Sequence, residues 1–309
     1  MSKLHLPSRR DFIHKSLFAT SGALLLPSLL EAASLSDFKK VKVNGHLWVY
    51  ASKFPPNWDA SPVLESVFSD MSYAGLDGIE LMESILRHDD GVTRLKKYAT
   101  QYSIPVSGSS YGVGFDMWDA SQFQTIADDL DRVVPRLAEV GGTTFGVSVG
   151  EADHPKTEAE LDAQAKILKV LMKICADHGI EVNLHNHTYE VENGLHDLKG
   201  TLARVPELKM GPDLNWLIRG GVDPVEFINT YGKQIVYLHI RDQYENGDWT
   251  EYVGQGVTDF SAISKALQKQ NFQGQAAIEL AFPNNFTPSN PLKEDWKMSR
   301  QFVHKAFGW

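Results

Sequence analysis

Along most of the chain, short apolar runs alternate with longer amphipathic segments. From residue 43 onward the hydrophobic period changes repeatedly from 2, typical of a strand, to 3.6, typical of a helix. We count eight segments of each kind. The expected strands cover residues 46–51, 78–82, 104–109, 143–149, 181–187, 208–215, 235–242 and 275–282.

The longer segments have the apolar spacing and the end signals of helices. The clearest spans residues 157–178, with apolar residues three or four apart and Gly179 as its stop signal. A second spans residues 120–140, just before Gly141 and Gly142. Weaker patterns cover residues 62–73, 92–102, 224–231, 260–268 and 291–307, and the least regular covers residues 190–204.

Eight strand–helix repeats without a long linker predict an α/β fold, a single closed (β/α)8 TIM barrel. The alternative is a doubly wound open sheet, which calls for a glycine-rich phosphate loop after an early strand. The sequence has no such loop, because Gly141-Gly142 precedes a strand and Gly254-Gln255-Gly256 lies between the seventh strand and its helix. We therefore expect one barrel domain over residues 34–309.

The first 33 residues differ in character from the rest. Arg9 and Arg10 precede a moderately apolar run over residues 16–30, which is followed by small residues at 32–34. This order is similar to a twin-arginine export signal with its cleavage site. A disordered tail or a membrane anchor is the alternative, although the run is short and weak for a spanning helix. We expect residues 1–33 to be removed, leaving a periplasmic or secreted protein without a stable membrane anchor.

The composition is that of an ordinary globular protein, with 42% apolar and 22% charged residues. Residues 1–33 hold four of the 30 basic and two of the 39 acidic residues, so the mature charge is 26 − 37, or −11. A surface this acidic repels phosphate backbones, so no nucleic-acid partner is expected. The lone Cys175 lies on the apolar face of a predicted helix and is expected to be a packed core residue.

Side chains able to bind a metal stand near the ends of the last four predicted strands. His185 and His187 end the fifth strand, and on a strand they would share one face. Asp213, His239 and Glu279 belong to the sixth, seventh and eighth. In a parallel barrel these side chains would converge at the C-terminal ends of the strands, where barrel enzymes place their chemistry. Each would be a costly buried polar group unless it had a partner.

Several short motifs accompany these residues. They are Gly78-Ile79-Glu80-Leu81, Leu184-His185-Asn186-His187, Gly211-Pro212-Asp213-Leu214-Asn215-Trp216, Gly220-Gly221-Val222-Asp223-Pro224, Leu238-His239-Ile240-Arg241-Asp242, Gly254-Gln255-Gly256-Val257-Thr258-Asp259-Phe260 and Ile278-Glu279-Leu280. Together they make the chain resemble the sugar phosphate isomerase/epimerase superfamily, the xylose isomerase-like TIM barrels, over residues 40–307.

The resemblance implies one divalent metal ion, often manganese, held by glutamate, aspartate, histidine and glutamate from strands five to eight. By position the last three are Asp213, His239 and Glu279. The chain departs from the pattern at His185, where the family usually has glutamate. Imidazole also suits manganese, iron or zinc, so the predicted ligands are His185, Asp213, His239 and Glu279. Cobalt and magnesium are further candidates for the ion.

Other residues are candidates for substrate binding. His187 is expected beside the metal ligands or facing the substrate. Glu80 would hydrogen-bond a sugar hydroxyl or orient His187, unless it forms a surface salt bridge. Trp216 is a candidate stacking platform for a sugar ring. Arg241 either binds substrate or pairs with Asp242.

The resemblance also implies a reaction, in which a base removes the proton beside a carbonyl and a metal stabilises the enediolate. Family epimerases use the two metal-bound glutamates as bases, and only Glu279 remains here. Either His185 or His187 is then the second base, or a single base suffices for an isomerisation or an elimination. Loss of the aglycone from a 3-keto-glycoside would be such an elimination.

Export favours a non-phosphorylated keto sugar or keto-glycoside as the small-molecule substrate. Two other classes remain open. A DNA-repair nuclease like the endonuclease IV branch of these barrels is opposed by the charge of the chain. A sugar-binding barrel without catalysis is suggested by the substitution at His185. Barrels of this family often pair, so a homo-oligomer is also open.

Overall fold

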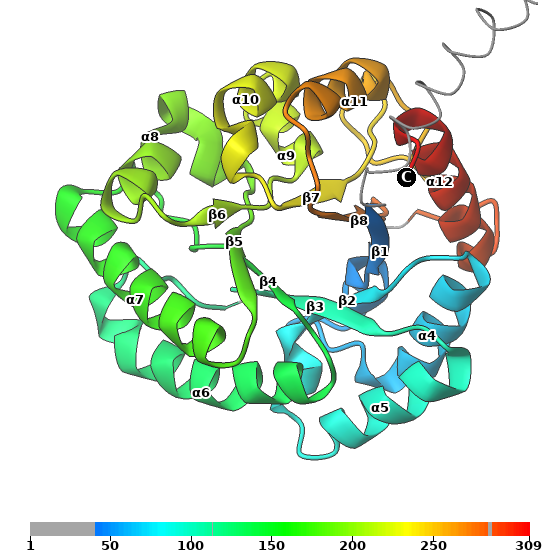
Figure 1. Cartoon of the computed structure of the whole chain (residues 1–309), viewed down its shortest axis with the longest axis horizontal. Coiled ribbons are helices and arrows are strands. Elements are labelled where there is room, and N and C mark those ends of the chain that lie inside the picture. Colours follow the sequence, from blue (N-terminus) through cyan, green and yellow to red (C-terminus); the bar gives the residue numbers. More distant parts are fainter. Residues whose placement is uncertain (1–40, 113, 284–285) are drawn as a thin grey trace, which may run out of the picture. The chain divides into compact units, whose positions relative to one another are not determined.

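A nearly closed barrel of parallel strands forms the centre of the protein. The computed structural model describes residues 41–112, 114–283 and 286–309. Neighbouring strands follow the order β6-β5-β4-β3-β2-β1-β8-β7 (Figure 1). Two parallel bridges between β6 and β7 bring the ring close to closure, pairing Met210 with Ile235 and Asp213 with His239. The strands are β1 Lys42–His46, β2 Ile79–Met82, β3 Val106–Tyr111, β4 Thr144–Val147, β5 Glu181–Leu184, β6 Lys209–Met210, β7 Tyr237–Ile240 and β8 Gln275–Glu279.

The predicted (β/α)8 barrel is therefore confirmed. The predicted export signal, residues 1–33, lies outside the described residues and stays a prediction, as does the boundary at residue 34.

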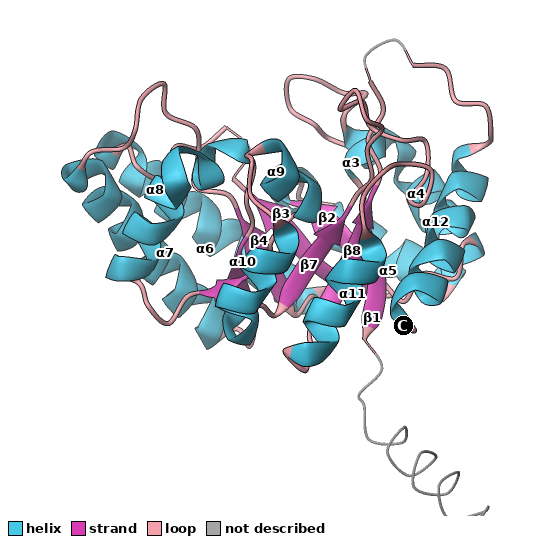
Figure 2. Ribbon diagram, turned by 90° about the horizontal axis from the view of Figure 1, so that it is seen from above, coloured by secondary structure: helices cyan, strands magenta, loops and turns pink. Residues whose placement is uncertain are grey.

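Helices surround the barrel on its outer side (Figures 1 and 2). They begin and end close to the predicted positions. The longest, α7, starts with a capping box, since the Thr157 N–H donates to the Glu160 carboxylate at 2.7 Å and the Glu160 N–H donates to the Thr157 hydroxyl. The α-helices are α3 Trp48–Ala51, α4 Leu64–Tyr73, α5 Gly91–Tyr102, α6 Phe123–Glu139, α7 Glu158–Asp177, α8 Thr188–Arg204, α9 Leu214–Arg219, α10 Pro224–Tyr231, α11 Phe260–Lys269 and α12 Leu292–Phe307. Short 3₁₀ turns are η1 Ser61–Val63, η2 Glu83–Arg87, η3 Ala120–Gln122 and η4 Gly232–Gln234.

The position predicted for the first strand was wrong. The sequence predicted a strand over residues 46–51, whereas β1 ends at His46 and residues 48–51 form the short helix α3. Periodicity cannot tell a short, fully buried apolar run on a helix from one on a strand. The shift places His46 at the C-terminal end of its strand.

The sixth strand is shorter than predicted. Its expected range was 208–215, but the chain leaves the sheet after Met210 and turns into α9. Asp213 is the N-cap of this helix, and its Oδ1 accepts the backbone N–H groups of Asn215 (2.9 Å) and Trp216 (3.1 Å). The cap fixes the Asp213 side chain at the top of the barrel and places Trp216 on the first turn of α9.

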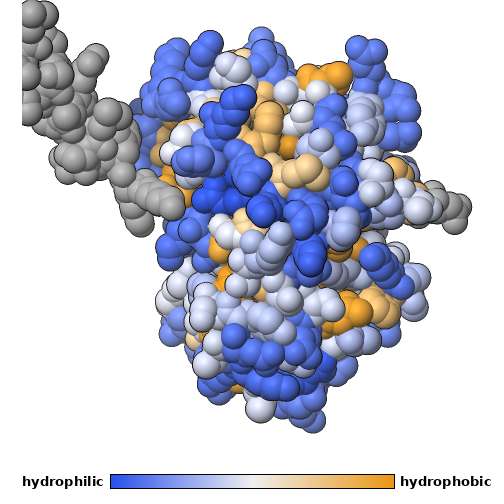
Figure 3. Space-filling model, turned by 90° about the vertical axis from the view of Figure 1, so that its right-hand side faces the viewer, coloured by the Kyte–Doolittle hydropathy of each residue, from blue (hydrophilic) through white to orange (hydrophobic). Residues whose placement is uncertain are grey.

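The outer surface over α4 and α12 is mostly hydrophilic, with hydrophobic areas scattered over it (Figure 3). Among the described residues the exposed large hydrophobic side chains are Tyr73 on α4, Tyr244 and Val257 in the β7–α11 loop, and Phe286 between β8 and α12. No helix in the described ranges has the length and apolar character needed to cross a bilayer. The homo-oligomer stays a prediction.

Trp296 on α12 joins that helix to the first β/α unit. Its side chain is fully buried, and its Nε1–H donates to the Tyr50 hydroxyl at 3.1 Å, which donates in turn to Asp70 at 2.9 Å. We predict that Trp296→Ala lowers the free energy of unfolding by about 3–5 kcal/mol, measured by urea denaturation, because it leaves a large cavity. The control Tyr244→Ala, at a side chain 39% exposed, should cost about 0.5 kcal/mol or less. Equal losses in the two variants would contradict this account of α12.

Candidate active site

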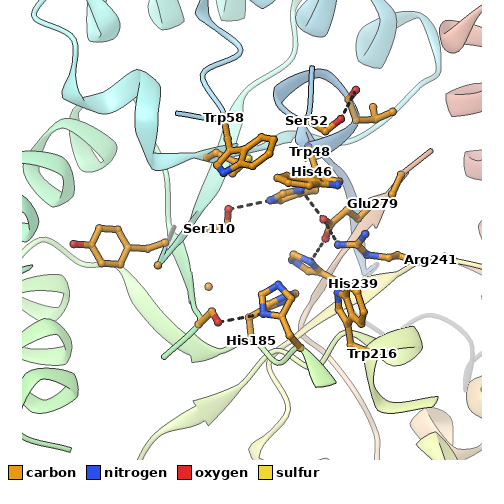
Figure 4. Close-up of a pocket in the computed structure, with 18 of the residues that line it drawn as sticks. His46, Trp48, Ser52, Trp58, Ser110, His185, Trp216, His239, Arg241 and Glu279 are labelled. Atoms are coloured by element: carbon orange, nitrogen blue, oxygen red, sulfur yellow. Dashed lines mark hydrogen bonds and ion pairs between the residues drawn. The ribbon is translucent and has the colours of Figure 1, made fainter. Parts of the chain in front are cut away.

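Five polar side chains meet at the C-terminal ends of the strands, and Figure 4 labels four of them: His46, His185, His239 and Glu279. None of them is more than 6% exposed. Groups of this kind are stable in a barrel interior only when they are paired or hold an ion. They are His46 at the end of β1, His185 after β5, Asp213 before α9, His239 in β7 and Glu279 at the end of β8.

His185, Asp213 and His239 form the tightest part of this cluster. Each offers one ligand atom, and the three atoms lie within 4.8 Å of one another. Nδ1 of His185 is buried and has no hydrogen-bond partner among the described residues. Burial, with the neighbouring His239 and His187, holds the pKa of His185 well below its usual range, so the ring is neutral and keeps a free lone pair. A neutral imidazole of this kind, next to a carboxylate and a second imidazole, fits a divalent transition metal.

His239 lies between two glutamates. Its Nε2 is 2.9 Å from Oε2 of Glu80, and its Nδ1 is 2.7 Å from Oε2 of Glu279. Burial alone would lower the pKa of His239, but Glu80 and Glu279 outweigh it and raise the pKa to about 10. The Tyr237 hydroxyl also donates to Glu80, at 3.0 Å. A carboxylate behind the far ring nitrogen is the usual support of a metal-binding histidine, because it fixes the tautomer and the ring orientation.

Arg241 connects the two remaining predicted ligands. Its Nε donates to Oδ2 of Asp213 at 2.8 Å, and its Nη2 donates to Oε1 of Glu279. Although burial opposes it, Arg241, with His46 and His239, holds the pKa of Glu279 well below its usual range. The expected alternative, pairing of Arg241 with Asp242, is wrong. Asp242 instead accepts backbone N–H groups of the β7–α11 loop, including those of Gly254 (2.9 Å) and Gly256 (2.8 Å).

His187 faces the cavity beside this cluster. Its ring lies 5.0 Å from that of His185 in an edge arrangement, so the two imidazoles do come together, although both follow β5 instead of lying on it. Its Nδ1 is 3.2 Å from the Ser148 hydroxyl and 3.0 Å from the Tyr189 hydroxyl. Burial, with the charge of Arg241, lowers the pKa of His187 to about 4. The ring is therefore neutral near pH 7.

The sequence analysis did not identify Glu190, which holds His187 in place. Glu190 accepts the backbone N–H of His187 at 2.7 Å and the Ser148 hydroxyl at 2.7 Å, and burial raises its pKa to about 7. A glutamate three residues after a helix N-cap is a recognised start signal, so the spacing from His187 to Glu190 could have indicated it.

His46 was also missed, because the expected first strand began at this residue instead of ending there. Its Nδ1 lies 3.4 Å from Oε1 of Glu279, and its Nε2 lies 3.0 Å from the Ser110 hydroxyl. The misplaced first strand hid this position, since it put His46 at the wrong end of the barrel.

His46, His185, His239 and Glu279 of this cluster line a cavity of about 1000 Å³, and Asp213 is buried behind it. Trp216, predicted to stack on a sugar, lies in its wall, with its ring 5.6 Å from His187 and 5.2 Å from Trp249. Arg241 also reaches the cavity. Glu80 was predicted to touch a sugar or His187, but it is 1% exposed and its contact is with His239.

Comparison with known proteins agrees with this geometry. Residues 68–305 match the model of the family described as xylose isomerase-like TIM barrel. An inosose dehydratase of Clostridium beijerinckii is 20% identical over 285 residues, covering 82% of this chain and 93% of the relative. The solved structure of a D-allulose 3-epimerase from Methylomonas sp. with D-allulose superposes with a TM-score of 0.72 at 17% identity, covering 87% of this chain and 98% of the epimerase. That of a 3-keto-D-glucoside 4-epimerase from E. coli gives 0.66 at 18% identity, covering 85% and 100%.

The fold and the polar cluster at the strand ends define the class, an α/β barrel with its site at the C-terminal face. The match over residues 68–305 gives the family, and the chain belongs to the xylose isomerase-like TIM barrels. At identities below 20%, the likeness to the two solved structures shows the shared fold.

The raised pKa of His239 can be tested directly. We predict that Glu80→Gln lowers the pKa of His239 in metal-free protein from about 10 toward the ordinary value of 6.5, because the variant removes a carboxylate that outweighs burial. A pKa raised on folding contributes stability that is fully present below pH 6.5 and is lost as the pH rises to about 10. The variant should therefore lose less stability than the wild type over that interval.

The measurement is an NMR titration of the histidine ring protons, with His239→Gln to assign the resonance. An unchanged pKa in Glu80→Gln would show that Glu80 does not set the charge of His239.

Proposed function

We propose that the protein is a divalent-metal-dependent enzyme of the sugar isomerase/epimerase type, which removes a proton beside the carbonyl of a non-phosphorylated keto sugar or keto-glycoside. The observation that carries this proposal is the buried, unpartnered Nδ1 of His185 next to Asp213 and His239. Most buried polar atoms in native proteins have a hydrogen-bond partner, so the free Nδ1 of His185 supports an ion or a ligand at this point.

The ion would be held by His185, Asp213 and His239, with Glu279 as the fourth ligand. Manganese is the first candidate, and zinc, iron, cobalt and magnesium are the others. A bound divalent ion would polarise the substrate carbonyl and stabilise the negative charge that develops on its oxygen. Glu80 behind His239 and Arg241 behind Asp213 would keep these ligands in place.

Among the groups of the site, His187 is the best placed base. It faces the cavity, its Nδ1 is held by Ser148 and Tyr189, and its lowered pKa keeps it neutral. Glu279 is a weaker candidate, because its carboxylate is already bonded to Arg241 and His239. Of the three predicted acid–base residues, Glu279, His187 and His185, His187 would thus be the base, and the other two would hold the ion or the groups around it.

One base favours an elimination. His187 would take the proton from the carbon beside the ketone, the electron pair would form a carbon–carbon double bond, and the neighbouring carbon–oxygen bond would break. The departing oxygen would leave as water or as the aglycone alcohol after taking up a proton. The curated relative named inosose dehydratase and the solved 3-keto-D-glucoside 4-epimerase support keto substrates of this kind.

A second function, a sugar-binding barrel without catalysis, is favoured by one observation. Arg241 already pairs with Asp213 and Glu279, so part of the site is neutralised without an ion. For location we propose export by the twin-arginine route, on the pattern of residues 1–33.

We predict about one divalent ion per chain by elemental analysis of protein folded in medium containing manganese and zinc. Asp213→Ala should lose the ion, because it removes the only carboxylate of the three-residue cluster. Asp223→Ala, at the N-cap of α10 outside the cavity, is the matched control and should keep it. A wild-type protein without metal would instead favour a sugar-binding barrel without catalysis.

The reaction is tested with 3-keto-glucose and a methyl 3-keto-glucoside in D2O. We expect the protein with metal to exchange the proton beside the ketone, or to eliminate the neighbouring oxygen, at a rate that His187→Asn lowers by about 10²–10⁴-fold. Folding of this variant is checked by circular dichroism. If His187→Asn reacts at the wild-type rate, another residue is the base. If the metal-loaded wild type exchanges no proton and eliminates no oxygen, the proposed reaction is rejected.

A further inference from the structure

The cavity is larger than its polar floor requires. Its volume of about 1000 Å³ is at the upper end of the range for pockets that enclose drug-sized ligands. Four histidines and Glu279 line this cavity, together with aromatic side chains that include Trp48, Trp58, Phe282 and Phe286. In Figure 4, Trp48 and Trp58 lie beyond His46, on the opposite side from His185.

Two adjacent loops carry this aromatic wall. The Trp48 and Trp58 rings follow β1 and lie 5.4 Å apart at an angle of 49°. Phe282 and Phe286 follow β8, with ring centroids 5.1 Å apart. Because β1 and β8 are paired neighbours in the barrel, both loops leave the sheet on the same side of the mouth.

Trp58 is held in an unusual backbone conformation. Its φ is +50°, in the left-handed region that bulky residues rarely adopt. Two hydrogen bonds fix it there, from its N–H to the Phe54 carbonyl at 2.9 Å and from the Ser84 hydroxyl to its own carbonyl at 3.3 Å. Strain of this kind persists where the surroundings enforce it, and it gathers at ligand-binding sites. Here it holds the indole against Trp48 at the cavity wall.

We infer that Trp48, Trp58 and Phe282 form a subsite for the ring-shaped aglycone of a keto-glycoside, whose sugar ring lies over His185, His187 and His239. The inference rests on the proposed function for the position of the sugar. A hydroxyl-rich ring suits the polar floor, and a second ring with an apolar face suits the indoles. The aglycone would occupy the side of the cavity toward β1, where it can leave through the mouth after its bond to the sugar breaks.

The test uses glucosides that lack the ketone and are not turned over. Phenyl glucoside, methyl glucoside and a glucose disaccharide are titrated into metal-free protein, and tryptophan fluorescence and calorimetry report the dissociation constants. We expect the phenyl glucoside or the disaccharide to bind about tenfold more tightly than the methyl glucoside, because only these two carry a second ring. Whichever of these two ligands has the lower dissociation constant shows whether the subsite prefers an aryl ring or a sugar ring.

Trp58→Ala should abolish this preference, and Trp58→Phe should retain most of it. Tyr73→Ala, at an exposed aromatic on α4, is the control and should behave as the wild type. Retention by Trp58→Phe also shows that loss in Trp58→Ala is not misfolding. Equal affinity for all three glucosides, or a preference that survives in Trp58→Ala, would overturn the inference.

Turnover of the matching 3-keto-glucosides by metal-loaded protein separates this inference from the proposed function. A ring preference that depends on Trp58, found without turnover, supports the subsite and rejects the proposed reaction. Turnover with no preference in binding supports the reaction and rejects the subsite.

Discussion

The site depends on a chain of alternating charges buried at the top of the barrel. Glu80 contacts His239, His239 contacts Glu279, Glu279 contacts Arg241, and Arg241 contacts Asp213. Three carboxylates in a dry interior would be very costly alone, and here two cations stand between them. Removing one member would leave an uncompensated buried charge. This row of alternating charges therefore fixes both the positions and the protonation states of the side chains that face a ligand.

This arrangement gives each imidazole a different character. His239, between two carboxylates, has a raised pKa, whereas His185 and His187 have lowered values because burial dominates. A histidine must be neutral to bind a metal ion, so an ion bound at His239 would displace a proton. The barrel thus separates the roles among side chains only a few ångströms apart. The ring of His239 is oriented by Glu80, that of His185 keeps a free lone pair, and that of His187 faces the cavity.

The sequence was sufficient to predict the barrel, because eight changes of hydrophobic period can be read from the chain alone. It also located His185, Asp213, His239 and Glu279, since polar residues at the ends of parallel strands must converge. The first strand was misplaced because a short apolar helix has the same pattern as a buried strand, and His46 was lost with it. The pairing of Arg241 depends on distances across the barrel, which no local pattern contains. Trp58 was missed for a similar reason, because its backbone conformation and ring contacts belong to a loop.

Whether the buried cluster holds a single divalent ion is tested most directly by anomalous diffraction at the manganese edge, from crystals grown with manganese. We expect one strong peak in contact with His185, Asp213 and His239. A structure without anomalous density at these side chains, with Arg241 still bridging Asp213 and Glu279, would contradict it.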